Sequence, residues 1–251
     1  MCLRCFPIIV GIIVVFSIAI VLSTLIPDSS LAMLLRYLTA VLESFMVPMI
    51  HNRADWYKEL SKVALKHLSW MFEIKMHRSE IAAKPGALYV FNQPHYCNWK
   101  TIVSSACLTL ISPRHKIVVD DYGVLPGIRS SDHVIRINAF KKGNFNLLRD
   151  QMRSCLHQGI DVIAYAEGNN AVKYRVPGTD PFCLQEFKSG IFSIAEELDG
   201  CECVPCLISP VIRFIRKAPI EIYIGPVFKG TDLLKRTHTF MQKVLNEWKQ
   251  N

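Results

Sequence analysis

The stretch ALYVFNQPHYCNW, residues 87–99, begins with a short apolar run and continues with polar and aromatic residues. A short apolar run bounded by turn residues is typical of a strand buried in a parallel sheet, which is covered on both faces. The same order recurs in DVIAYAEGNN, residues 161–170. Because open α/β sheets bind ligands beyond the carboxyl ends of their strands, the polar residues after each run are candidate site residues.

Outward from these two stretches, short apolar runs alternate with helical patterns, which predicts an α/β domain with a mostly parallel sheet flanked by helices. Strands are expected at Ala87–Phe91, Lys116–Val119, Val134–Ile137, Asp161–Tyr165, Val204–Ile208 and Ile220–Ile224. Helices are expected at Phe145–Leu156, Phe187–Leu198 and Leu233–Trp248. No internal repeat or low-complexity linker divides the chain after residue 51, so we expect one domain there.

The 251-residue chain has 29 Lys and Arg against 21 Asp and Glu, and 51% of its residues are hydrophobic, too many for a disordered tail. The charged residues among the first 50 are Arg4, Arg36, Asp28 and Glu43, so the net charge of +8 falls on residues 51–251. This basic part favours a negatively charged membrane surface or a phosphorylated ligand. No nucleic acid partner is expected, because the sequence lacks zinc-finger spacing, leucine heptads and long basic runs.

An apolar leader precedes the basic part. Residues Phe6–Ile26 have no charged side chain and are close to the roughly 20 residues that cross a bilayer as a helix. A cleaved signal peptide is the alternative, although its apolar core is usually about 7 to 15 residues long. A second apolar stretch, Leu31–Ile50, would span, re-enter or lie in the interface. The sequence thus predicts an N-terminal membrane helix or helical hairpin.

Residues Trp56–Phe72 fit a helix with apolar residues on one side and Lys58, Lys62 and Lys66 on the other. Such a basic amphipathic helix either lies on a membrane surface or packs on its own domain. Positive residues beside a membrane segment tend to stay in the cytoplasm, so we expect the domain to face the cytosol.

Nine cysteines are scattered without the spacing of a disulfide module, which indicates reduced thiols. Cys201, Cys203 and Cys206 suggest a zinc knuckle, but no second Cys/His pair has suitable spacing, so no metal is expected. Cys2 and Cys5 beside the first apolar segment are either sites of S-acylation or ordinary thiols.

Phosphate-loop and dinucleotide fingerprints and the Gly-x-Ser-x-Gly nucleophile elbow are absent from the sequence. What remains is an ordered set of blocks that resembles the glycerophospholipid acyltransferase family, in particular the lysophosphatidic acid (1-acylglycerol-3-phosphate) acyltransferases. The resemblance extends over about residues 84–229, and the family's blocks are Asn-His-x4-Asp, Phe-Pro-Glu-Gly-Thr-Arg, Phe-Lys-x-Gly-x-Phe and Val-Pro. The corresponding blocks here are Asn92-Gln93-x4-Asn98, Ala166-Glu167-Gly168-Asn169-Asn170, Phe187-Lys188-Ser189-Gly190-Ile191-Phe192 and Val204-Pro205.

The resemblance implies that Gln93 and Asn98 stand where the family has its catalytic His and Asp. In the family the His deprotonates the acceptor hydroxyl, which attacks the thioester of acyl-CoA, and the Asp orients the His. An amide accepts no proton at neutral pH, and general-base catalysis contributes about 10² to 10⁴ in rate. His95, two residues further on, is either a displaced base or a surface histidine.

The resemblance also implies a phosphate-binding block in which Glu167 and Gly168 are retained, while Asn169 and Asn170 replace the family's Thr-Arg pair. An amide lacks the charged fork with which Arg binds phosphate. Lys173 and Arg175 are either substitute phosphate ligands or solvated loop residues. Arg136 is displaced by one position from the Arg of the family's second block.

The predicted organisation is a membrane-anchoring part at residues 1–50, a basic amphipathic linker helix at 51–80 and an acyltransferase-like domain at 81–251. We expect a membrane protein of phospholipid metabolism at the endoplasmic reticulum or another endomembrane. It would be impaired in acyl transfer and would bind lysophospholipid or acyl-CoA or regulate a protein partner whose identity the sequence does not indicate. The alternative is a working acyl-CoA:lysophospholipid acyltransferase that uses His95. Apart from acyl-CoA as co-substrate or ligand, no cofactor is implied.

Overall fold

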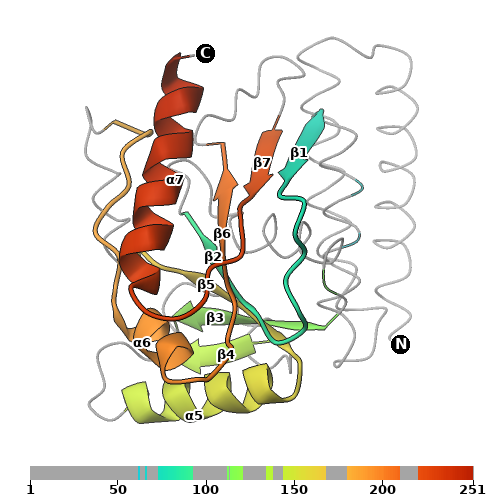
Figure 1. The fold of residues 1–251 in the computed structure, drawn as a ribbon, viewed down its shortest axis with the longest axis vertical. Helices are drawn as coiled ribbons and strands as arrows, with labels where there is room; N and C mark the ends of the chain where they lie inside the picture. Colours follow the sequence, from blue (N-terminus) through green and yellow to red (C-terminus); the bar gives the residue numbers. More distant parts are fainter. Residues whose placement is uncertain are drawn as a thin grey trace, which may run out of the picture.

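The computed structural model describes residues 62, 66, 73–92, 112, 114–120, 134–137, 144–167, 180–209 and 220–250 (Figure 1). Lys62 and Lys66 are helical. All other residues of the predicted basic helix Trp56–Phe72 lie outside the described residues. The apolar segments Phe6–Ile26 and Leu31–Ile50 also lie outside them. In the part of the chain that is described, no helix combines the length and the apolar character needed to cross a membrane.

The described residues form a seven-stranded, mostly parallel sheet, in strand order β1-β7-β6-β2-β5-β3-β4. The five strands from β6 to β4 are mutually parallel, whereas β7 runs antiparallel to β6 and pairs in parallel with β1. The predicted α/β class and the mostly parallel sheet are therefore confirmed. The strands are β1 (Ile74–Arg78), β2 (Leu88–Phe91), β3 (His115–Asp120), β4 (Val134–Ile137), β5 (Asp161–Tyr165), β6 (Cys203–Ile208) and β7 (Ile220–Ile224).

Three described helices pack on the sheet: α5 (Asn144–His157), α6 (Gly190–Glu196) and α7 (Leu233–Gln250). In Figure 1, α7 runs along β6 and α5 lies below β3 and β4. The predicted strands and helices are all present, but α6 begins at Gly190, three residues later than predicted. The reason is tertiary, since the backbone N–H of Lys188 donates to Ala166 O, just after β5, at 2.8 Å.

Strand β1 was not predicted from the sequence. Its residues, IKMHR, are exposed or partly buried, so they lack the continuous apolar run of the inner strands. As an edge strand it is stabilised by pairing with β7. β1 lies within residues 51–80, so the sheet begins before the boundary at residue 81 that the sequence suggested.

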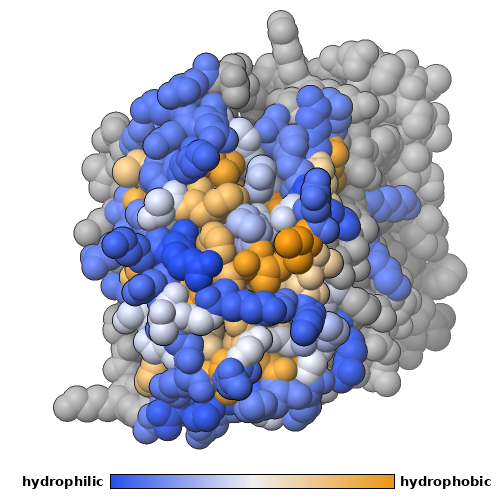
Figure 2. Space-filling model, viewed as in Figure 1, coloured by the Kyte–Doolittle hydropathy of each residue, from blue (hydrophilic) through white to orange (hydrophobic). Residues whose placement is uncertain are grey.

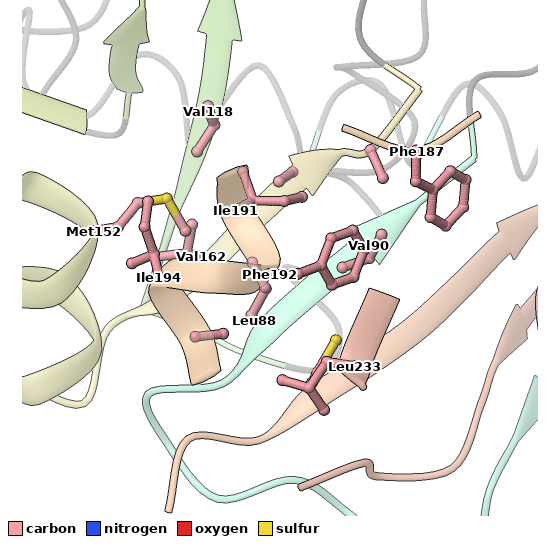
Figure 3. Packing of buried hydrophobic residues seen from close by; sticks show 14 of the residues in the cluster. Leu88, Val90, Val118, Met152, Val162, Phe187, Ile191, Phe192, Ile194 and Leu233 are labelled. Atoms are coloured by element: carbon pink, nitrogen blue, oxygen red, sulfur yellow. The ribbon is translucent and has the colours of Figure 1, made fainter. Parts of the chain in front are cut away.

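The core lies between the sheet and the three helices. Leu88 and Val90 of β2 point toward the helices and contact Phe192 and Ile194 of α6, all with 1% exposure or less (Figure 3). Each fully buried side chain of this size contributes about 1.5 to 3 kcal/mol relative to an exposed position. Tyr89 and Phe91, which alternate with these residues, point to the opposite face and are also buried, as a parallel sheet requires.

The start of β2 is held by the start of β5. Asp161 Oδ1 accepts hydrogen bonds from the backbone N–H groups of Gly86 (2.8 Å) and Ala87 (2.9 Å). Gly86 has φ of 90°, and a Cβ at this position would overlap the carbonyl oxygen of Leu156. Glycine is therefore required in the turn that leads into β2.

Candidate functional site at the carboxyl edge of the sheet

The two stretches that suggested the fold end at the same edge of the sheet. Strands β2 and β5 are parallel neighbours, and Phe91, the last residue of β2, is in register with Tyr165, the last residue of β5. Asn92 follows β2 directly, and Glu167 follows β5 after Ala166. The structure thus brings the first residue of one predicted site block together with the acidic residue of another.

Asn92 joins the end of β2 to the end of β6. Its side chain is 3% exposed; Nδ2 donates to Ile208 O at 3.0 Å, and Ile208 N donates to Oδ1 at 2.8 Å. The backbone N–H of Asn92 also donates to Cys206 O at 3.3 Å. These three hydrogen bonds therefore fix the position of Asn92, the residue after β2.

Glu167 is completely buried, and its Oε2 accepts a hydrogen bond from the backbone N–H of Gln185 at 3.0 Å. Together with the bond from Lys188 N to Ala166 O, this contact holds the segment 180–189 against the end of β5. That segment contains the beginning of the Phe187–Phe192 block, so two of the blocks quoted from the sequence are in direct contact. Glu167 is thus a positioning residue for this segment.

The segment 180–189 is held on its other side by α7. Gln242 accepts from Leu184 N at 2.9 Å through Oε1 and donates to Phe182 O at 2.9 Å through Nε2. Lys249 Nζ lies 2.6 Å from Asp180 Oδ2. Gln242 and Lys249 were not singled out in the sequence, where the only signal was that Gln242 lies in the predicted helix Leu233–Trp248 and Lys249 directly after it.

His238 of α7 packs edge-on against the ring of Phe187, with ring centroids 4.8 Å apart. Burial lowers the pKa of this histidine from its ordinary value, and a hydrogen bond with the backbone of Gln185 only partly opposes that effect. At neutral pH His238 is therefore a neutral packing residue beside the Phe187–Phe192 block.

The remaining predicted site residues fall into two groups. The backbone of Arg136 lies in β4 and pairs with Val119 of β3, three strands from β2 and so about 14 Å away across the sheet. Arg136 therefore does not lie on β2 or β5, the two strands that lead to Asn92 and Glu167. The others lie outside the described residues: Gln93, His95, Asn98, Gly168, Asn169, Asn170, Lys173 and Arg175.

The described cysteines Cys155, Cys183, Cys201, Cys203 and Cys206 are free thiols. Burial raises the pKa of Cys203 to about 12, and its Sγ lies 3.6 Å from Thr237 Oγ1. A thiol in this state is protonated at neutral pH and is a poor metal ligand. Among the residues that the structure describes, no three His, Cys, Asp or Glu side chains are grouped so that they could hold a metal ion.

The chain is thus an α/β protein with a mostly parallel sheet. At the carboxyl edge of that sheet, Asn92 is hydrogen bonded to Ile208 after β2, and Glu167 is buried after β5. Comparisons with protein-family models, with curated proteins and with solved structures found no match for the chain.

Proposed function

We propose that the chain is a membrane-bound protein with a glycerophospholipid acyltransferase-like domain in which acyl transfer is lost or greatly weakened. It binds lysophospholipid or acyl-CoA, or regulates a partner in lipid metabolism. We infer attachment to the endoplasmic reticulum or another endomembrane, with the domain toward the cytosol. The proposal combines the ordered blocks of the sequence with the edge of the sheet at which two of them meet.

The observation that supports the proposal most directly is the adjacency of β2 and β5. Blocks that are about 75 residues apart in the chain, at Asn92 and Glu167, end at one sheet edge, where open α/β folds bind their ligands. The third block is hydrogen bonded to Ala166. An acyltransferase-like arrangement needs these blocks to be neighbours, and the pairing satisfies that need.

The loss of turnover follows from the residue types. To form an ester, an acceptor hydroxyl must lose its proton as its oxygen attacks the thioester carbon of acyl-CoA, and the thiol of CoA then leaves. Gln93 accepts no proton at neutral pH, and Asn98 has no negative charge with which to stabilise an imidazolium. The same amides still form hydrogen bonds, so ligand binding does not depend on the missing base.

The second candidate is an active lysophosphatidic acid-type O-acyltransferase that uses His95 as its base. This candidate is favoured by the position of His95 only three residues after Asn92, whose side chain is clasped to β6. Three residues extend at most about 11 Å, so His95 stays within that distance of the carboxyl edge. General-base catalysis requires hydrogen-bond contact with the hydroxyl, which a displaced histidine achieves only if its loop compensates.

The experiment that tests the proposal is transfer of a radiolabelled acyl group from acyl-CoA by the purified full-length chain, with a panel of lysophospholipids as acceptors. We expect product no higher than in a buffer control, together with binding of acyl-CoA or a lysophospholipid in an equilibrium measurement. Robust turnover would favour the second candidate. Absence of both turnover and lipid or acyl-CoA binding would contradict the active enzyme and the proposed ligand binding, and would leave regulation of a partner as the proposed role.

A further inference from the structure

A cavity of about 300 Å³ lies at the amino edge of the sheet, opposite the edge that holds Asn92 and Glu167. It is bounded by the segment between β1 and β2, by the starts of β3 and β5 and by the end of β7. Its volume is at the lower limit of small-molecule sites. Since β2 spans roughly 13 Å from one edge to the other, this cavity is separate from the candidate site above.

The apolar part of the cavity wall comes from the segment between β1 and β2 and from β6 and β7. Val204 and Ile224 lie on the sheet, and Ile81 is at the surface with 70% exposure. Figure 2 shows hydrophobic surface over the segment between β1 and β2, with hydrophilic surface above and below it in this view. Because Ile81, Val204 and Ile224 all line the cavity, its wall favours a ligand with an apolar part.

Tyr89 lines this cavity together with two other buried polar residues, Ser112 and Asp161. Tyr89 is 4% exposed, and its hydroxyl has no hydrogen-bond partner among the described residues. Burial raises the pKa of Tyr89, and the negative charge of Asp161 raises it further, so the hydroxyl stays protonated at neutral pH. The hydroxyl faces the cavity, so it can donate a hydrogen bond to an acceptor bound there.

The cavity also has an excess of positive charge. Arg78, at the end of β1, and Arg114, just before β3, both line it and are exposed. Arg78 and Tyr89 line the same cavity, so one ligand can reach both side chains. Within the described residues, the hydrogen bond of the Arg78 side chain is from Nε to Met76 Sδ at 3.0 Å, so its terminal nitrogens can donate to a ligand. Asp161 is the acidic residue of the wall, and its Oδ1 already accepts from Gly86 and Ala87.

We propose that this cavity binds a small amphipathic anion, a carboxylate or a phosphate monoester. The acidic head accepts hydrogen bonds from Arg78 and from the Tyr89 hydroxyl, and the apolar part lies against Ile81, Val204 and Ile224. Arg114 adds a second positive charge at the rim. This site does not depend on the function proposed for the carboxyl edge, because none of its residues belongs to the acyltransferase-like blocks except Val204.

The test uses the full-length chain and three water-soluble probes of similar size: benzoate, phenyl phosphate and uncharged benzyl alcohol. Isothermal titration calorimetry is expected to detect at least one anion, bound at least about tenfold more tightly than benzyl alcohol. The anion that binds more tightly identifies the head group. If neither anion binds at about 10 mM, or if benzyl alcohol binds equally well, the proposal is wrong.

Three variants locate the binding site. Arg78→Gln should weaken anion binding about tenfold or more, whereas Lys75→Gln, which removes a positive charge from the same strand outside the cavity, should change it less than about twofold. Tyr89→Phe should weaken binding and, because the hydroxyl has no partner, should not lower the melting temperature of the ligand-free chain. Equal effects of Arg78→Gln and Lys75→Gln, or unchanged binding by Tyr89→Phe, would overturn the assignment. Should Arg78→Gln alter the circular dichroism spectrum, Tyr89→Phe alone decides.

Discussion

The side-chain amide of Asn92 links the ends of two neighbouring strands. Its nitrogen and its oxygen both form hydrogen bonds with the backbone of Ile208. Asn92→Ala would leave a buried N–H and a buried carbonyl without these partners. We expect this variant to lose about 2 to 4 kcal/mol of unfolding free energy in urea denaturation. Asn146→Ala, at an exposed position of α5, should change the unfolding free energy by no more than about 0.5 kcal/mol. Equal losses in the two variants would refute the structural role of Asn92.

The residues at positions 93 and 98 decide between binding and turnover. Under the proposed function, Gln93→His with Asn98→Asp restores a base and its orienting acid at the family's five-residue offset, and measurable acyl transfer should appear above the native level. Adding Asn170→Arg should lower the KM for a phosphorylated acceptor, because a guanidinium binds phosphate through two hydrogen bonds. Gln93→Ala with Asn98→Ala is the matched control and should stay at background.

The competing candidate makes a different prediction for the same assay. If His95 is the base, the native chain has activity, His95→Ala lowers it by about 10² to 10⁴, and Gln93→Ala leaves most of it. A native activity that responds in this way would replace the proposed function with the active enzyme.

The burial and the hydrogen-bond partner of Glu167 could not be predicted from its residue type. The sequence suggested a substrate-binding role from its block, and the structure places its carboxylate in a buried hydrogen bond to the backbone of Gln185. Burial and partner depend on the segment 180–189, which lies in a separate part of the chain. No local pattern around residue 167 contains that information.

At the scale of elements, the start of α7 depends on a side chain from α6. Glu196 Oε1 accepts a hydrogen bond at 2.8 Å from the N–H of Leu233, the first residue of α7, where a negative charge also offsets the helix dipole. Glu196→Ala should lower the unfolding free energy by about 0.5 to 2 kcal/mol in urea. Glu197→Ala, the matched control, removes only a 3.7 Å ion pair with Arg153 between half-exposed side chains and should cost at most about 1 kcal/mol. The prediction fails if Glu197→Ala costs as much.

A second link between elements makes stability depend on pH. The buried carboxyl of Glu202 accepts from Lys84 N at 2.6 Å and lies 2.8 Å from Lys229 Nζ. Burial acts to raise the pKa of Glu202, but the hydrogen bonds from Lys229 and Lys84 outweigh burial and hold it below the ordinary value of 4.5. Because the folded-state pKa is the lower one, the stabilisation is fully present above about pH 4.5 and is lost as the pH falls through the folded-state pKa.

Urea denaturation at pH values from 7 down to below about 4.5 tests whether the Glu202 carboxyl stabilises the fold in this way. Glu202→Gln should be less stable than the native chain at pH 7 by about 1 kcal/mol, and the difference should vanish in acid. Glu80→Gln, at an exposed position, should keep the native pH dependence. If Glu202→Gln loses stability in acid just as the native chain does, the Glu202 carboxyl does not cause that loss.

Elements also differ in how far their local sequence predicts them. The inner strands β2, β5 and β6 are largely apolar runs and, apart from Asp161 at the start of β5, carry no charged residue, so their type follows from composition over a few residues. Strand β1 has no such run, and α6 starts late because Lys188 bonds to Ala166. Both differences come from pairing with a distant segment, which a local pattern does not contain.

At the scale of the whole molecule, the proposed attachment rests on the uncharged residues Phe6–Ile26. We expect full-length protein to stay with the membrane pellet after alkaline carbonate extraction, since a span of this length partitions strongly, whereas a single amphipathic helix binds reversibly. Val14→Arg with Val15→Arg should release much of it, because each charge at the centre of a span costs about 2.5 to 3.5 kcal/mol. Recovery of the native chain in the soluble fraction would contradict the anchor.

The sequence by itself determined the α/β class, the mostly parallel sheet and the approximate bounds of six strands and three helices, because apolar periodicity is a local property of consecutive residues. Only the tertiary structure decided the strand order, the clasp of Asn92 on Ile208 and the burial of Glu167 against Gln185. The cavity beside Tyr89 likewise joins residues from five strands and their connections. Hydrogen bonds and cavities depend on which distant segments meet, and that is settled by packing the whole domain at once.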